Sequence, residues 1–449
     1  MEYLKLFSSH TDYEEYLTGG TMVKPNVSYC KDVKDVHYNP YIHDYSQDYF
    51  TTVALENGTI SFDIWSSMGT DMITSISYST DNGETWTTTN NVNDKAENLV
   101  ITVNVNEGDQ VLWKGDAQQF GFYDHDHSDY VGSFFSSTCS FDAMGNVMSF
   151  IYGDNFVGET TIEKECCFLS LFFDYDENKS CGVVNANNLV LPATTLSNQC
   201  YQGMFRGCTS LTSAPQLPAT TLADYCYYYM FRGCTSLTST PQLPATTLTD
   251  YCYQNMFYGC TSLTSAPELP ATTLAEECYV EMFRDCISLT SAPELPATTL
   301  TMACYGGMFG DCTSLLSAPE LPATTLSNQC YQGMFNGCTN LTTAPQLPAT
   351  TLADACYCYM FNGCTSLTTA PELPATTLTD YCYEGMFQGC TSLNYIKAMF
   401  TTTPSITYTD NWVYGVAASG TFVKNSAATW NVSGVNGVPN GWTIQTASA

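Results

Sequence analysis

The sequence predicts an α/β solenoid of eight 26-residue turns with capping units, preceded by a small all-β sandwich and an extended N-terminal arm. The main observation is a repeat that opens with Leu-Pro-Ala-Thr-Thr-Leu and recurs every 26 residues without an insertion. A fixed period without gaps indicates that each copy forms one turn of a coil, with equivalent side chains stacked from turn to turn. The eight copies start at Leu191, Leu217, Leu243, Leu269, Leu295, Leu321, Leu347 and Leu373.

An apolar side chain recurs every four residues in the first copy, at Leu196, Cys200, Met204 and Cys208. This stripe predicts a helix from about residue 196 to 206, and Gly207 suits a left-handed residue that closes it. A short extended stretch follows at 211–214, and Pro215 ends it because proline cannot donate to the middle of a sheet. Strand, turn and helix in each copy make up the layout of a leucine-rich repeat.

Helices need more lateral space than strands, so this layout predicts a bent array with strands on its concave side and helices on its convex side. The strand residues vary little between copies and predict a flat concave face lined with hydroxyl groups. These residues are Thr212, Thr238, Thr264, Thr290, Thr342 and Thr368. The positions that vary most lie on the predicted helices, which places them on the outer surface.

Sixteen of the 22 cysteines form two columns, with one pair eight residues apart in each repeat. On a helix that separation is about 12 Å, which is too long for a disulfide, and cysteine packs as a small hydrophobe. We therefore expect two columns of reduced, buried thiols, with disulfides between adjacent turns as the alternative. Zinc is disfavoured because the array contains no histidine. The adjacent Cys166 and Cys167 are expected in the core.

The composition changes on both sides of the array, and it predicts five segments. Residues 1–44 are an N-terminal docking arm, 45–135 a β-sandwich of about seven strands, and 136–190 a connector with a degenerate first coil. In that coil Phe172 takes the place of Phe205. Residues 191–398 are the repeat array, and 399–449 are expected to cap it, since a coil array needs atypical end units to cover its core.

Two motifs in the predicted sandwich could carry chemistry. Ser79 to Trp86 fits the Asp-box pattern, in which the aspartate ties a hairpin and the tryptophan is buried. A single copy of that motif is no evidence of glycosidase activity. His125 and His127 share a strand face within an Asp-His-rich stretch, which is compatible with a metal site or a solvated polar loop. We expect the loop, because the chain offers no obvious third ligand.

The formal charge of −31 comes from −21 in residues 1–190, −11 in 191–396 and +1 in 397–449. Nucleic-acid binding is disfavoured because no basic patch exists to displace counterions. No apolar run long enough to cross a membrane occurs. The N-terminus lacks the basic and apolar regions of a secretion signal, so we expect synthesis in a host cytoplasm and release from it by lysis.

The segment Met256 to Pro270 (Met-Phe-Tyr-Gly-Cys-Thr-Ser-Leu-Thr-Ser-Ala-Pro-Glu-Leu-Pro) resembles BspA-like leucine-rich repeats of surface proteins in Bacteroides-type gut bacteria. The leader is similar to N-terminal segments of structural proteins in phages of those hosts. This resemblance implies adhesion or attachment, with a virion anchor in the leader. The residues that carry the anchor are Pro25, Asn26, Tyr29, His37, Tyr38 and Pro40.

These observations predict a non-enzymatic phage virion protein, on a tail or head fibre, that attaches to host cell or mucosal glycans. The expected partners are other virion proteins through the arm and a host glycan or protein through the repeats. A homo-oligomer is compatible with a fibre. The alternative is a cell-surface adhesin of a gut bacterium. No nucleophile–base pair, phosphate loop or metal set is evident, so we expect no enzyme activity, cofactor or metal.

The candidate binding residues are tyrosines that interrupt the repetition on the outer surface. A tyrosine is suited to glycan or protein contact because its ring is apolar on the face, polar at the tip and easily immobilised. The set is Tyr225, Tyr228, Tyr229, Tyr251, Tyr258, Tyr359 and Tyr381. The tyrosine after each first cysteine, such as Tyr201 or Tyr227, never changes and is expected in the core.

Overall fold

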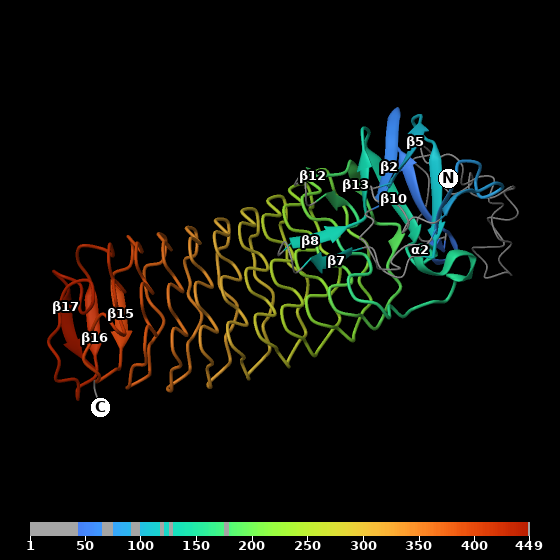
Figure 1. Cartoon of the computed structure of the whole chain (residues 1–449). Coiled ribbons are helices and arrows are strands. Elements are labelled where there is room, and N and C mark those ends of the chain that lie inside the picture. The colour runs from blue at the N-terminus through green and yellow to red at the C-terminus, as the bar shows by residue number, and fades with distance from the viewer. Residues whose placement is uncertain are drawn as a thin grey trace, which may run out of the picture.

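A computed structural model of the whole chain describes residues 44–64, 75–90, 99–116, 121–124, 129–174 and 179–447. Figure 1 shows a β-rich body at one end and a long row of stacked coils that runs from it to the C-terminus. The predicted arm, including all six of its predicted docking residues, lies outside the described residues apart from Asp44.

The N-terminal body contains two sheets that share one core, a larger mixed sheet and a smaller antiparallel one. The larger sheet has the order β13-β10-β1-β6-β3-β4, and β14 also pairs with β10. Its strands are β1 (Phe50–Ala54), β3 (Ser75–Ser79), β4 (Thr87–Asn90), β6 (Gln110–Gly115), β10 (Phe141–Asn146), β13 (Val183–Asn185) and β14 (Leu189–Val190). The smaller sheet has the order β5 (Leu99–Val105), β2 (Gly58–Ile64) and β9 (Phe134–Ser137).

Aromatic rings fill the space between the two sheets. Phe50 of β1 lies 5.4 Å from Phe135 of β9, and Phe62 of β2 lies 6.3 Å from Trp113 of β6, measured between ring centroids. These contacts agree with the β prediction for this region. The predicted end of the sandwich at residue 135 falls within β9. The larger sheet also continues beyond it, because β10 pairs with β1, with Thr51 opposite Met144.

Short elements complete the body. They are η3 (Tyr45–Gln47), α2 (Ser149–Tyr152), η5 (Gly153–Asn155), the hairpin of β7 (Gly121–Asp124) with β8 (Asp129–Gly132), and the hairpin of β11 (Phe173–Asp174) with β12 (Lys179–Ser180). His125 and His127 lie between β7 and β8, outside the described residues.

The body and the coil array share one continuous core. Strands β13 and β14 pair in parallel with β10, and bridges then join Asn185 to Ser213 and Val190 to Gln216. The Phe172 ring stacks on the Phe205 ring at a centroid distance of 4.9 Å. Phe172 therefore occupies the position of Phe205 in a preceding coil, as its place in the sequence predicted.

The predicted helices are wrong. Between β14 and β15 the chain forms no helix and no strand beyond isolated bridges, and residues 198–207 of the first coil run as consecutive turns. The backbone becomes left-handed at every fourth residue, with φ of 57° at Gln199, 60° at Gly203 and 68° at Gly207. A left-handed residue interrupts a right-handed helix, so the α/β class is corrected to a mostly β fold with few helices.

The turns are joined from coil to coil by hydrogen bonds from alternate residues. The N–H of Tyr201 donates to the Cys226 carbonyl at 3.0 Å, and the N–H of Gly207 donates to the Arg232 carbonyl at 2.7 Å. The intervening Met204 donates back to Tyr201 within its own coil at 3.3 Å. No helices widen one side of the array, which removes the reason for the predicted bend, and Figure 1 shows the coils following a nearly straight axis.

Identical side chains stack along the core of the array. The invariant tyrosines, from Tyr201 to Tyr383, form one column with centroid distances of 5.7–6.0 Å and near-parallel rings. The phenylalanines from Phe205 to Phe387 form a second column. All of these rings are buried, which confirms that the invariant tyrosines are packing residues.

The C-terminal segment ends the array with a small parallel sheet and buried tryptophans. The sheet has the order β15 (Tyr395–Ala398), β16 (Thr421–Lys424) and β17 (Thr443–Thr446). Trp412, Trp430 and Trp442 are buried, and each indole N–H donates to a backbone carbonyl. These rings cover the apolar core at the end of the last coil.

Candidate functional site

Five of the seven candidate tyrosines occupy left-handed backbone positions on the turns. The φ angles are 56° at Tyr225, 60° at Tyr229, 58° at Tyr251, 54° at Tyr359 and 57° at Tyr381. A bulky residue is rare in this region because its Cβ crowds the backbone. Glycine occupies the position of Tyr229 and Tyr359 in four of the other coils, at Gly203, Gly307, Gly333 and Gly385. The chain therefore holds these two rings where its own repeat often uses glycine.

The structure brings five of the tyrosines together on the second and third coils. The Tyr225 and Tyr251 rings stack at a centroid distance of 4.4 Å. The Tyr228 ring contacts the Tyr225 ring edge-on, with 5.6 Å between the centroids, and its centroid lies 3.7 Å from that of Tyr229. We call these residues, with Tyr258 and Arg232, the tyrosine–arginine face.

Arginine completes this face, although no arginine is among the candidate residues that the sequence indicated. The Arg232 guanidinium lies 4.7 Å from the Tyr229 centroid and 4.6 Å from the Tyr258 centroid, so it sits between two rings. The Arg206 guanidinium lies 5.4 Å from the Tyr229 centroid and 4.8 Å from the Phe173 centroid. A cation held over an aromatic face in this way is attracted by the quadrupole of the ring. The result is an alternating column of guanidinium groups and tyrosines across adjacent coils.

A signal for this column is present in the sequence. Residues 191–396 contain only three basic residues, and all three follow the invariant phenylalanine of their repeats, at Arg206, Arg232 and Arg284. Tyr258 fills the same position in the coil between the last two. Arg284 differs from Arg232 because it forms ion pairs with Glu281 at 2.7 Å and Asp311 at 3.2 Å.

The other two candidate tyrosines lie apart from this face, in the seventh and eighth coils. The Tyr359 hydroxyl donates to the Glu384 carboxylate at 2.9 Å, and this bond with burial raises the pKa of Tyr359 to about 12. A Cβ added to Gly385 would meet the Tyr359 ring at 2.2 Å, so the ring lies directly on that glycine. Tyr381 is 51% exposed.

Carboxylates border the tyrosine–arginine face. A hydrogen bond to Asp285, then burial, raises the pKa of the Tyr258 hydroxyl. Burial raises the pKa of Tyr251, and the negative charge of Glu277 raises it further. Both phenols therefore stay neutral at physiological pH. The Tyr258 proton is engaged by Asp285, which leaves that hydroxyl oxygen able to accept a hydrogen bond from a ligand.

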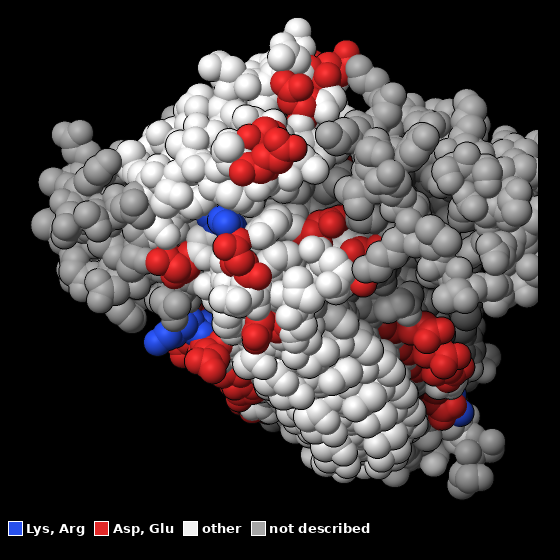
Figure 2. All heavy atoms as spheres, turned by 90° about the vertical axis from the view of Figure 1, so that its right-hand side faces the viewer, with Lys and Arg blue, Asp and Glu red and all other residues white. Residues whose placement is uncertain are grey.

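A second candidate surface is the row of exposed threonines on the coils. The six threonines predicted for a hydroxyl-lined face are exposed, although they do not lie on strands. Figure 2 looks from the body along the array and shows uncharged surface between two margins of Asp and Glu side chains. One acidic column recurs at a single repeat position, at Glu268, Glu294, Glu320 and Glu372.

The Asp-box closes the β3–β4 hairpin as predicted. The Asp81 carboxylate accepts from the Thr85 N–H at 2.8 Å and from the Ser79 hydroxyl at 2.7 Å. Hydrogen bonds from the Thr85 side chain and backbone, then from Ser79, lower the pKa of Asp81 to about 2. Trp86 is half-buried rather than buried as predicted, because its ring lies on the body's surface against Tyr49 at 5.0 Å.

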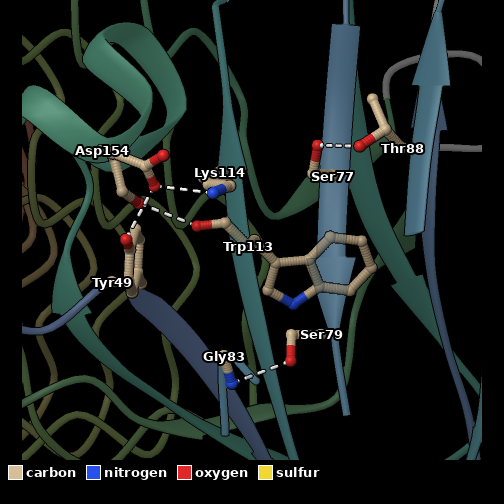
Figure 3. A network of polar contacts seen from close by, with 9 residues as sticks. Tyr49, Ser77, Ser79, Gly83, Thr88, Trp113, Lys114 and Asp154 are labelled. Carbon is tan, nitrogen blue, oxygen red and sulfur yellow. Dashed lines mark hydrogen bonds and ion pairs between the residues drawn. The ribbon is translucent and has the colours of Figure 1, made fainter. Parts of the chain in front are cut away.

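A polar network lies beside that tryptophan on the larger sheet, and Figure 3 shows its three members Tyr49, Lys114 and Asp154. The Lys114 ammonium lies 4.0 Å from the Trp86 centroid and forms an ion pair with Asp154 at 2.6 Å. The Tyr49 hydroxyl donates to the same carboxylate at 2.7 Å. Hydrogen bonds lower the pKa of Asp154, with the one from Lys114 contributing most and the one from Tyr49 next. Burial is the larger cause that raises the pKa of Tyr49 to about 12, and its hydrogen bond to Asp154 is the second. The arrangement joins three segments of the body.

The cysteines of the described residues are packing groups rather than reactive thiols. All cysteines in the described residues are buried free thiols, which confirms their predicted burial. Burial raises the pKa of Cys200 and Cys252 to about 12, so these thiols stay protonated and unreactive at neutral pH.

The described part of the chain has neither a metal cluster nor a membrane-spanning helix. It holds no group of three or more His, Cys, Asp or Glu side chains placed to bind a metal ion. It also has no helix of the length and apolar character needed to span a bilayer.

Comparison with known families identifies the repeats. A family model described as BspA type Leucine rich repeat region (6 copies) matches residues 181–315 and 307–413. No curated protein matches the chain. The two family matches extend from residue 181 to 413, which is more than half of the 449 residues. The chain therefore belongs to the BspA-type leucine-rich repeat family.

Proposed function

We propose that this protein is a non-enzymatic attachment protein whose tyrosine–arginine face binds glycans of a host cell or mucosal surface. Membership of the BspA-type family supports the coarser statement that it is a surface or adhesin-type repeat protein. The observation that carries the proposal is the pair of tyrosine rings, Tyr229 and Tyr258, on either side of the Arg232 guanidinium.

The chemistry of this face suits a carbohydrate. Tyrosine rings offer apolar faces for the C–H side of a sugar, and their hydroxyls exchange hydrogen bonds with its hydroxyl groups. The Arg232 guanidinium presents a planar fork of donors that matches a carboxylate. An acidic sugar within a mucosal glycan would use the rings and the guanidinium together.

The test replaces the face with residues that the repeat itself uses elsewhere. Tyr229→Gly, Arg232→Asn and Tyr258→Asn copy Gly203 and Asn336 from equivalent positions, so the coils keep their backbone. We expect this triple variant to fold normally and to lose most binding to immobilised mucin. The matched control, Tyr359→Gly with Tyr381→Gln, removes two tyrosines from distant coils and should keep binding.

Unchanged mucin binding by the triple variant would contradict the proposal. A Thr264→Glu, Thr290→Glu variant distinguishes the other surface, because it places charge among the exposed threonines and leaves the tyrosines unchanged. If only that variant loses binding, the threonine-lined side is the binding surface.

The finer part of the proposal places the protein on a phage virion, with residues 1–44 docked to the particle. The resemblance of the leader to phage structural proteins supports it. Deleting residues 1–44 should leave a folded protein that still binds mucin and no longer incorporates into particles. Normal incorporation of the truncated protein would contradict the docking role and leave the glycan proposal intact.

A further inference from the structure

The C-terminal sheet ends in an open edge. Strand β17 pairs with β16 on one side and with no other strand in the described chain, and all four of its residues are exposed. The Thr443 N–H donates to Gly420 at 2.8 Å, and the Ala447 N–H donates to Lys424 at 2.9 Å. Since alternate residues of a strand face opposite neighbours, Ile444 and Thr446 direct their N–H and C=O groups outward.

A core column also reaches this edge. Ile396, Phe422 and Ile444 lie in register across the three strands. Ile396 and Phe422 are fully buried, whereas Ile444 is 47% exposed. The buried tryptophans cover the apolar core elsewhere at this end of the array. Ile444 is therefore the last side chain of the row Ile396, Phe422, Ile444, and it remains partly exposed to solvent.

The charge of the molecule favours contact between copies at this end. Residues 397–449 contain only Lys397, Lys424 and Asp410 as charged residues, for a net charge of +1, whereas the whole chain carries −31. Two acidic molecules repel each other over most of their surfaces. The C-terminal segment is the part of the chain where that repulsion is weakest.

We propose that β17 pairs with β17 of a second copy, in antiparallel register about a two-fold axis through Gln445. Ile444 then exchanges backbone hydrogen bonds with Thr446 of the second copy, and Thr446 with Ile444 of that copy. The pairing satisfies the outward N–H and C=O groups and covers the exposed Ile444 side chains. The two arrays meet end to end, with their N-terminal bodies at opposite ends of the dimer.

The test measures mass by sedimentation velocity over a concentration series of the full chain. Wild type should form a dimer that strengthens as salt rises, because salt screens the repulsion between the acidic copies. Thr446→Pro removes an outward N–H while the bonds to β16 remain, and proline is tolerated at such edge positions. Ile444→Glu places like charges together across the axis. Both variants should be monomers with wild-type circular dichroism.

The matched control is Ile287→Glu, which makes the same change at a side chain that is 45% exposed on a central coil. It should dimerise like wild type. Mixing Ile444→Glu with Ile444→Lys should restore a mixed dimer. A wild type that stays monomeric at every concentration and salt, or a dimer that persists in both edge variants, would overturn the proposal.

Discussion

The Cys260 thiol donates a hydrogen bond to the Phe231 carbonyl oxygen of the preceding coil, at a sulfur–oxygen distance of 3.1 Å. The same carbonyl accepts the Cys234 N–H at 3.1 Å. Equivalent thiol bonds recur along the array, from Cys234, Cys286, Cys312, Cys338, Cys364 and Cys390. The second cysteine of each repeat therefore packs in the core and links two coils through its S–H group.

Replacing the two kinds of cysteine should have different effects. Cys260→Ala should lower the free energy of unfolding by about 1–2 kcal/mol through the small void. Cys260→Ser retains a donor near the Phe231 carbonyl, whereas the equally buried Cys226 has no thiol–carbonyl bond among the described residues. Cys226→Ser buries a hydroxyl without a partner, at a cost of about 1–3 kcal/mol.

Thermal melting of the three cysteine variants checks this order. Cys226→Ser should melt below Cys260→Ser, and equal melting temperatures would show that the thiol bond contributes nothing. A reducing agent should leave the wild-type melting temperature unchanged. A fall of many degrees on reduction would show instead that disulfides join the coils.

The buried tyrosine column offers a second test. The hydroxyl groups of Tyr201, Tyr227 and Tyr253 are buried without a hydrogen-bond partner in the described structure. Since an unsatisfied buried hydroxyl costs about 1–3 kcal/mol, Tyr253→Phe should leave the melting temperature unchanged or raise it. Tyr253→Leu, which keeps an apolar side chain but breaks the ring stack, should lower it. A clear loss of stability in Tyr253→Phe would show that the hydroxyl has a partner.

Asp142 on β10 should make stability depend on pH in the unusual direction for a carboxylate. Burial raises its pKa to about 6, above the value of about 3.9 in an unfolded chain. The native state then binds more protons than the unfolded state between these values, so this group stabilises the fold as the pH falls through 6 and destabilises it as the pH rises.

The difference between Asp142→Asn and wild type isolates this group, because the other carboxylates titrate in both proteins. Asp142→Asn should melt above wild type at pH 8, and the gap should close as the pH falls towards 4. A gap that stays constant with pH, or widens on acidification, would show that Asp142 is not held in a raised-pKa environment.

The repeat length, the invariant core residues and the left-handed Gly207 could be predicted from the sequence, because stacking fixes them in every coil. The helix could not be inferred safely from the stripe at Leu196, Cys200, Met204 and Cys208. A spacing of four residues drifts about 40° per step around a helix with 3.6 residues per turn. A ladder of four-residue turns has no such drift, and Gly203 and Gly207, four residues apart, match its left-handed positions.

The candidate site was predictable only in part. The tyrosines that break the repetition could be named from the sequence, since every other residue at these positions is smaller or charged. Their grouping depends on which coil carries each one, so Tyr225 meets Tyr251 one coil away while Tyr359 lies near Glu384 instead. The role of Arg232 emerges only when Tyr229 and Tyr258 are seen on either side of it.

Tyr229 and its neighbour Tyr228 test whether backbone strain holds the candidate face in place. Tyr229 has a φ of 60°, whereas Tyr228 does not lie in the left-handed region. Alanine is normally more stable than glycine, but a left-handed residue with a Cβ costs about 1–2 kcal/mol. Tyr229→Gly should therefore melt above Tyr229→Ala, and Tyr228→Gly should melt below Tyr228→Ala. If alanine is the more stable replacement at both positions, the left-handed turn at Tyr229 is absent in solution, and the geometry of the tyrosine–arginine face is wrong.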